Sequence, residues 1–425
     1  MSTVTAPAPV ATPGAPVAPR AWRTPILLAV AGVLTLVLFG VLGRDETTSF
    51  VWGSGIEPTE ASPRLVGIVL GLLSLAAAGV AFWMANQRRK VSVWLSVIAG
   101  VAFLVSVTAW VGAGETIPVV FLLTGTIALS TAIVFGALAG VVGERVGIVN
   151  IAIEAQLLAG AFTAAVVATT TGNYFVALVA AMISGALISV VLAVFAIVYV
   201  VDQVIVGVVL IALVIAVTNF LYSAVLATNS SAFNNPGTLP LIAIPLLSDI
   251  PVIGPVFFNQ RVTTYLLFIL VRLSWFSLFR TRPGLCIRAL GEHPLAADTV
   301  GINVNRWRFW TITIAGAIAG LGGASLTIGA VGPFVREMSA GQGFIALAAV
   351  ILGRWNPWGA AIAALLFGFA SNFRIWAGQA GSTLPPELIA MTPYLVTILA
   401  VAVVAGRVVG PKAAGKPYIK EGARD

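Results

Sequence analysis

The chain has few of the residues on which enzymes and metal centres depend. Its 425 residues include one cysteine, Cys286, and one histidine, His293. A single cysteine excludes an internal disulfide framework, and no cluster of His, Cys, Asp or Glu has metal-site spacing. The G-x-S-x-G and H-E-x-x-H motifs are also missing. We therefore expect no catalytic residue, no metal and no cofactor bound by this chain.

Charge is scarce as well. Charged residues make up 9% of the chain and hydrophobic residues 59%, whereas a soluble domain carries about 25% charged residues. This composition predicts an all-α polytopic membrane protein in contact with lipid. The net charge of +8 does not indicate nucleic-acid binding, because the basic residues lie in short loops and tails beside apolar stretches.

The apolar stretches predict about 11–12 hydrophobic segments and one membrane domain. Residues 1–24, rich in proline and alanine, predict a disordered tail. Residues 25–112 would hold three spans, 113–409 the remaining spans, and 410–425 a basic tail. The expected segments lie at 26–42, 65–85, 92–112, 117–142, 151–171, 174–200, 204–227, 262–279, 309–330, 343–352, 359–376 and 388–405, and the one at 343–352 is too short to cross alone.

The basic residues predict the orientation, because lysine and arginine are retained on the cytoplasmic side. If the N-terminal tail is cytoplasmic, alternation of sides also puts residues 86–90, 280–308 and the C-terminal tail inside. The acidic loop at 43–64 and the long segment at 228–261 then lie outside. We therefore expect both termini in the cytoplasm.

Two spans contain signs of a break. Glycines at 140, 143 and 147 favour a broken or re-entrant helix. Asn150 and Glu154 follow, four residues apart, so we expect them on one helix face. A carboxylate at mid-membrane costs about 2.5–3.5 kcal/mol, so Glu154 either lines a solute path or braces neighbouring helices.

The second break is predicted at 329–343, which is rich in small residues and contains Arg336 and Glu337. It is interpreted as a loop that dips back into the protein, or as an ordinary external turn. Other polar residues in or near spans are further candidates for the solute path or for helix contacts: Thr218, Asn219, Gln342 and Asn372.

The loop at 280–308, RTRPGLCIRALGEHPLAADTVGINVNRWR, carries five arginines between two apolar spans. Pro294 is typical of a first helical turn and Gly301 of a left-handed C-terminal residue, so PLAADTV predicts a helix of about two turns. Such a helix can enter a groove in a partner protein, although a solvated loop is also compatible with the residues.

The GPKAAGKP stretch at 410–417 has Pro417 where a phosphate loop needs Ser or Thr, so we expect no ATP hydrolysis here.

The chain resembles the membrane permease subunits of bacterial ABC importers, in the family that serves ribose-type sugars, branched-chain amino acids and nucleosides, and most closely its nucleoside branch. The stretches that carry the resemblance are GERVGIVNIAIEAQLLAGAF, VDQVIVGVVL, the arginine loop, and the run from GAIAGLGG to GFASNF. The resemblance implies that residues 292–301 form the coupling helix that docks on the ATPase subunit. Its expected residues are Glu292, His293, Pro294, Leu295, Ala296, Ala297, Asp298 and Gly301.

The resemblance further implies half of a translocation path for a nucleoside, with ATP and magnesium bound by separate ATPase subunits. A second related permease and an extracytoplasmic solute-binding lipoprotein are the other expected partners. Where the nucleoside branch has Gly-Leu-Glu-Gly, this chain keeps Glu154 but has Ala152 and Ala155, and Ile211 replaces a common asparagine. Alternatives are a simple-sugar permease of the same family and an ion-coupled secondary transporter.

Overall fold

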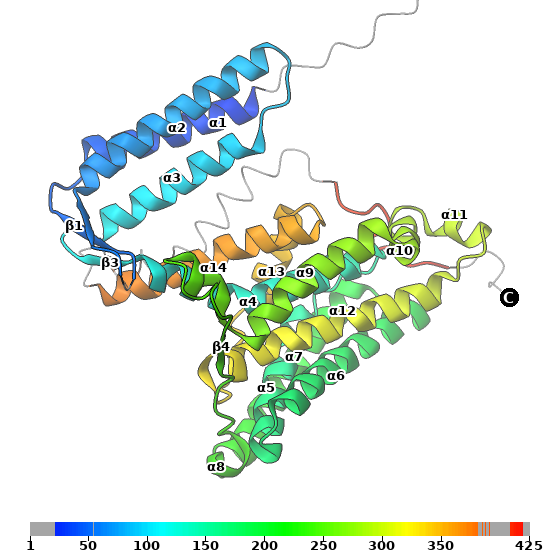
Figure 1. The fold of residues 1–425 in the computed structure, drawn as a ribbon. Coiled ribbons are helices and arrows are strands. Elements are labelled where there is room, and N and C mark those ends of the chain that lie inside the picture. Colours follow the sequence, from blue (N-terminus) through cyan, green and yellow to red (C-terminus); the bar gives the residue numbers. More distant parts are fainter. Residues whose placement is uncertain are drawn as a thin grey trace, which may run out of the picture. The chain divides into compact units, whose positions relative to one another are not determined.

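A computed structural model describes residues 22–53, 55–380 and 409–419, together with Pro385, Glu387 and Met391. The chain forms two compact units. The first holds residues up to Phe50 and from Pro58 to Ile117, and the second holds residues 51–57 and the chain from Pro118 onward. Figure 1 shows that long helices build both units.

Three helices form the N-terminal unit: α1 (Arg23–Leu34), which continues as the π-helix η1 (Thr35–Val41), α2 (Pro63–Asn86) and α3 (Val93–Val111). Helix α2 begins where the Ser62 hydroxyl accepts a hydrogen bond from the Leu65 amide, at 3.3 Å. Gly71 lies against the Leu36 backbone, where an added Cβ would come within 2.8 Å. Small residues on α2 thus allow its close contact with η1.

Short strands connect these helices. They are β1 (Thr48–Val51), β2 (Thr59–Ala61) and β3 (Thr116–Pro118), in the order β2-β1-β3. Strands β1 and β2 are antiparallel, with Thr48 opposite Ala61. The Arg64 guanidinium binds the Asp45 carboxylate at 2.7 Å beside this sheet.

The second unit contains the rest of the described chain. Its β4 and β5 form an antiparallel pair, with Leu241 opposite Arg261. The elements are α4 (Val119–Arg145), α5 (Ile153–Thr171), α6 (Tyr174–Ala193) with η2 (Val194–Val198), α7 (Gln203–Leu221) with η3 (Tyr222–Leu226), α8 (Ser230–Phe233), β4 (Leu241–Ala243), η4 (Gly254–Phe258), β5 (Asn259–Arg261), α9 (Val262–Arg280), α10 (Arg282–Glu292), α11 (Pro294–Thr299), α12 (Val304–Leu326) with η5 (Thr327–Val331), α13 (Gln342–Leu352) and α14 (Pro357–Gln379).

Ten helices of the described residues are long and apolar enough to cross a membrane, which confirms a polytopic all-α membrane protein. Each matches a segment expected from the sequence, and α13 is the short eleventh. The expected segment at 388–405 and the N-terminal tail before residue 22 lie outside the described residues.

Helices α5, α6 and α12 meet through glycines in the core of the second unit. An added Cβ at Gly320 of α12 would meet the Ala181 carbonyl oxygen and come within 3.1 Å of the Gly185 Cα on α6. A Cβ at Gly160 of α5 would in turn meet the Gly320 backbone. The three backbones are therefore in direct contact, as small residues permit between membrane helices.

Replacing Gly320 with leucine should destabilise the second unit, because three packed helices would have to separate. Overpacking of this kind costs about 1–3 kcal/mol or more of unfolding free energy. Gly378→Leu is the matched control, since nothing lies within 4 Å of its added Cβ. Thermal unfolding of the detergent-purified variants tests this, and equal unfolding temperatures would contradict the packing described.

Candidate functional site

At the position of the first expected break, the chain turns back on itself between α4 and α5. Helix α4 ends at Arg145, and Gly147 turns the chain with a φ of 93°. The following residues return along α4: Gly143 faces Asn150, and Gly136 and Gly140 face Ile153, where α5 begins. Helix α5 therefore starts about two turns inside the level at which α4 ends. Because Asn150 precedes the helix, the expectation that it shares a helix face with Glu154 was wrong.

Glu154 holds the second broken segment to the first. Its carboxylate is 5% exposed and accepts hydrogen bonds from the Ser339 hydroxyl at 2.6 Å, the Gly341 amide at 2.9 Å and the Gly343 amide at 2.6 Å. These amides lie at the start of α13, where the partial positive charge of a helix favours an anion. Both oxygens are occupied, so the geometry favours the bracing role for Glu154.

The second break is the segment from residue 332 to 341, between η5 and α13, which we call the return loop. The Asn234 side chain forms two bonds with the Phe334 backbone, at 2.7 and 2.9 Å. The Phe334 ring is fully buried and meets Phe162 edge-on, with ring centroids 5.3 Å apart. The return loop is thus anchored to the protein through Phe334.

Charged side chains tie the return loop to α7 and η3. The Arg336 guanidinium donates to the Ser223 hydroxyl at 2.7 Å and lies over the Tyr222 ring at 5.2 Å. The Asn219 amide donates to the Glu337 carboxylate at 3.1 Å. Asn219 and Glu154 therefore both bind the return loop.

The remaining predicted pathway residues lie in different surroundings. Asn150 and Gln156 exchange two hydrogen bonds, and Gln156 donates to the Ser189 hydroxyl on α6. The Thr218 hydroxyl donates to its own helix, and Asn372 donates to the Leu122 carbonyl at 2.8 Å. The bonds of Gln156 to Ser189 and of Asn372 to Leu122 join helices, whereas the bond of Thr218 stays within α7. The expected path role of the six residues remains a prediction, and only Glu154, Asn219 and Gln342 gather at the return loop and the start of α13.

The arginine loop folds into two helices, of which only α11 was expected. Pro294 begins it, the His293 Nδ1 atom accepts from the Ala296 amide at 3.3 Å, and Gly301 follows with a φ of 86°. Leu295 is 42% exposed, whereas Ala297 is 4% exposed and packs inward. Helix α11 thus presents one face to solvent, and Ala297 anchors its opposite side to the permease.

The described part of the C-terminal tail packs on this region. The Ala413 amide donates to the Gly291 carbonyl at 2.8 Å, at the end of α10. Arg308, 2% exposed, donates to the Lys416 carbonyl at 3.3 Å and lies against Gly147. Residues 409–419 therefore form a strap across the arginine loop and the first break, which the sequence had suggested was a plain tail.

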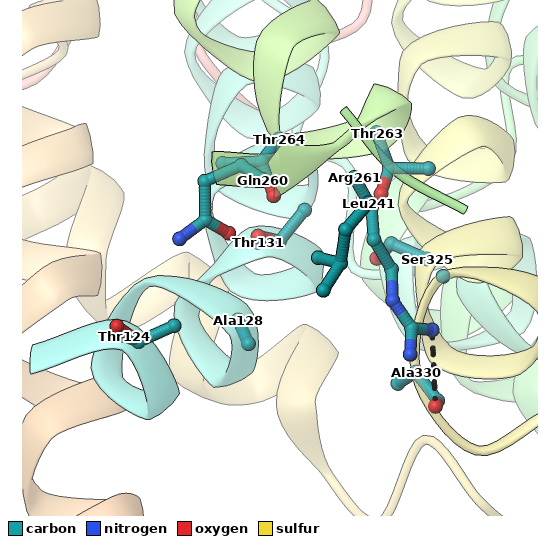
Figure 2. A pocket seen from close by; sticks show the side chains of 11 residues that line it. Thr124, Ala128, Thr131, Leu241, Gln260, Arg261, Thr263, Thr264, Ser325 and Ala330 are labelled. Carbon is teal, nitrogen blue, oxygen red and sulfur yellow. Dashed lines mark hydrogen bonds between the residues drawn. The ribbon is translucent and has the colours of Figure 1, made fainter. Parts of the chain in front are cut away.

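The second unit also holds a cavity that the sequence did not predict. It has a volume of about 300 Å³ and lies among α4, α9, η5 and the β4–β5 pair. Figure 2 shows side chains from these separate elements around one space. Its residues are Thr124, Ala128, Thr131, Leu241, Gln260, Arg261, Thr263, Thr264, Ser325, Gly329 and Ala330. The polar residues Gln260, Arg261, Thr263 and Thr264 at the start of an apolar span are the local sequence signal.

Arg261 is the one charged residue among those lining the cavity. Its guanidinium donates to the Ala330 carbonyl at 3.2 Å, and burial lowers the pKa of this guanidinium from its ordinary value. The cavity lies at the end of α9 opposite the arginine loop, because α9 runs from Val262 to Arg280.

Comparison with known proteins decides the family. The family described as "branched-chain amino acid transport system / permease component" matches residues 119–403. The chain belongs to this family of transport permeases. The match begins at the start of α4, so α1–α3 lie outside it. Family membership excludes the ion-coupled secondary transporter and an enzyme, and the chain is a multi-pass permease subunit of the bacterial plasma membrane.

Individual relatives agree with this family. The guanosine ABC transporter permease protein NupQ of Bacillus subtilis is 40% identical over 308 residues, which are 69% of this chain and 95% of the relative. The nucleoside ABC transporter permease protein NupC of Lactococcus lactis is 37% identical over 68% of this chain and 94% of its own length. TsgC13 of Haloferax volcanii, provisionally named a glucose ABC transporter permease protein, is 32% identical over 63% and 80%.

Bacillus subtilis contributes a second relative. The guanosine ABC transporter permease protein NupP, also from Bacillus subtilis, is 27% identical over 57% of this permease and 70% of its own length. No solved structure matches the chain.

Glu154→Ala should loosen the return loop, because it leaves a hydroxyl and two amides without an acceptor. Each buried donor without a partner costs about 1–3 kcal/mol. We expect faster hydrogen exchange of the amides at 341–345 and a lower unfolding temperature. Glu337→Ala is the matched control, since it removes one exposed bond to Asn219. Loss of transport with unchanged exchange would instead support a path-lining role for Glu154.

Proposed function

We propose that this permease is one membrane subunit of an ATP-driven importer that takes up a nucleoside. The observation that supports the substrate class best is the 40% identity to a guanosine permease across 95% of that relative. TsgC13 favours a simple sugar as the second candidate. ATP and magnesium would be bound by separate ATPase subunits.

We propose α11 as the coupling helix. Its exposed side offers Leu295, Ala296 and Thr299 to a groove, while Ala297 anchors it to the permease. The strap and α10 hold its base through the bond from Ala413 to Gly291. A docked ATPase subunit can therefore move α11 together with the ends of α10 and α12 rather than bending a free loop.

The orientation proposed from the basic residues agrees with these contacts. The arginine loop, the strap and the end of α4 lie at one end of the second unit, since Arg308 meets both Lys416 and Gly147. Arg145 at the end of α4 also donates to the Trp355 carbonyl at 3.0 Å. Retention of cationic side chains in the cytoplasm makes this the ATPase side.

The remaining partners follow from the importer class. Bacillus subtilis holds two guanosine permease proteins that are similar to this chain, NupQ and NupP. This pair supports a second, related permease as the other half of the path. A solute-binding lipoprotein on the outer face would deliver the nucleoside to it.

Uptake of radiolabelled guanosine tests the function. The permease, expressed with its ATPase, second permease and solute-binding lipoprotein in a host lacking nucleoside uptake, should import guanosine. Import should stop when the ATP-binding lysine of the ATPase is replaced. Guanosine import that survives this change would overturn the ATP-driven mechanism. Import of glucose but not guanosine would favour the sugar alternative.

Ala296→Arg should abolish uptake, because a long charged side chain on the exposed face of α11 would prevent docking. The amount of permease in the membrane should stay the same, since Ala296 is exposed. Val93→Arg is the control, at an exposed position of the N-terminal unit. ATPase co-purification and uptake are the measurements, and normal uptake by Ala296→Arg would refute the coupling assignment.

A further inference from the structure

The cavity described above contains more hydrogen-bonding groups than the protein itself uses. Thr263 and Thr264 line the cavity and are 2% and 3% exposed. Within the described part of the chain, the Thr124 Oγ1 atom is buried without a hydrogen-bond partner. A buried hydroxyl without a partner is unfavourable unless the cavity holds a group that binds it.

Gly329 of η5 lies beside one of these hydroxyls. An added Cβ at Gly329 would lie 3.1 Å from the Thr263 Oγ1 atom and 3.3 Å from the Ser325 Cβ atom. The Thr263 hydroxyl therefore lies next to Gly329 and Ser325 in the cavity wall. Figure 2 shows Thr263, Arg261 and Ser325 on the same side of the cavity.

The chemistry of the lining limits the ligand. Hydroxyls, one amide and one guanidinium line the cavity, and none of the eleven residues is acidic, so the site is unsuited to a cation. None of the eleven is aromatic, so a nucleobase would find no ring on which to stack. Arg261 uses NH1 on the Ala330 carbonyl and has further donors, because a guanidinium carries five.

The size of the cavity agrees with a small solute. Its volume of about 300 Å³ is at the lower end of the range for small-molecule sites. Neighbouring hydroxyls on a sugar ring can both donate and accept, as the Thr263 and Thr264 hydroxyls can. The lining thus suits a sugar ring with adjacent hydroxyls.

We propose that this cavity binds the ribose of the transported nucleoside, an inference that rests on the proposed function. It places the recognition of ribose at the ends of α9 and α12 that lie away from α11. The base would remain outside the group of hydroxyls. A free monosaccharide has the same hydroxyl chemistry, so the experiment must distinguish the two.

Protection of a thiol in the cavity tests the proposal directly. In full-length permease in membrane vesicles, the variant Ala128→Cys with Cys286→Ser places one thiol in the cavity wall without removing a hydroxyl. Guanosine should slow its reaction with N-ethylmaleimide by about fivefold or more, as expected for two to three hydrogen bonds. Free guanine should not slow it. The native Cys286, in the arginine loop, is the control thiol, and guanosine should leave its rate unchanged.

Removal of single hydroxyls identifies the groups responsible. Thr263→Val and Thr264→Val, each added to Ala128→Cys, should reduce the protection by guanosine. Thr131→Val should retain it, because the Thr131 hydroxyl already donates to the Ile127 carbonyl at 2.8 Å. Protection that survives the first two substitutions would overturn the proposal.

The ligand series separates this inference from the proposed function. Equal protection by guanine and guanosine, or protection by free ribose but not by guanosine, would overturn recognition of the nucleoside's ribose even if guanosine uptake is normal. Absence of guanosine uptake by the complete transporter would overturn the proposed function whatever the labelling shows.

Discussion

The second unit depends on one buried carboxylate, that of Glu154. Without partners a charge at this depth would cost about 2.5–3.5 kcal/mol. The side chain instead receives two amides and a hydroxyl at the start of α13. Helix α13 can begin inside the protein because Glu154 satisfies amides that a helix terminus leaves open. The first segment therefore supplies the acceptor, the Glu154 carboxylate, and the second supplies the hydroxyl and amide donors. This exchange explains why the two segments occur together.

Helix α13 is also held along its length and beyond its opposite end. Small residues let α13 lie on α4, with Gly136 facing Ala346 and Gly140 facing Val350. Beyond the end of α13, the Trp355 ring donates to the buried Glu144 carboxylate of α4. Carboxylates thus hold both ends of this short element, and it is fixed to α4 and α5 rather than free to move as a loop.

The sequence predicted the features that depend on local residues. Hydropathy located the ten spans, and Pro294 and Gly301 located α11, because proline and glycine act on their own backbone. The cavity was not predictable, since Thr131 and Thr263 are distant in the chain and only helix packing brings them together. The sequence predicted that Asn150 lies on a helix with Glu154, but α5 begins only at Ile153. Where α5 begins depends on which glycines of α4 the returning chain contacts, and helix packing decides this. The strap carries no pattern at all.

Helices α9 and α12 connect the two candidate sites of the second unit, which are the cavity and α11. Helix α9 spans 19 residues, or about 28 Å at 1.5 Å per residue, from the cavity to the arginine loop. Helix α12 begins just after α11 and reaches the cavity at Ser325. Coupling between distant sites requires an element with two arrangements that both sites bias. The close backbone contacts at Gly320 hold α12 against α5 and α6. A displacement at α11 would then reach the cavity as a shift of whole helices.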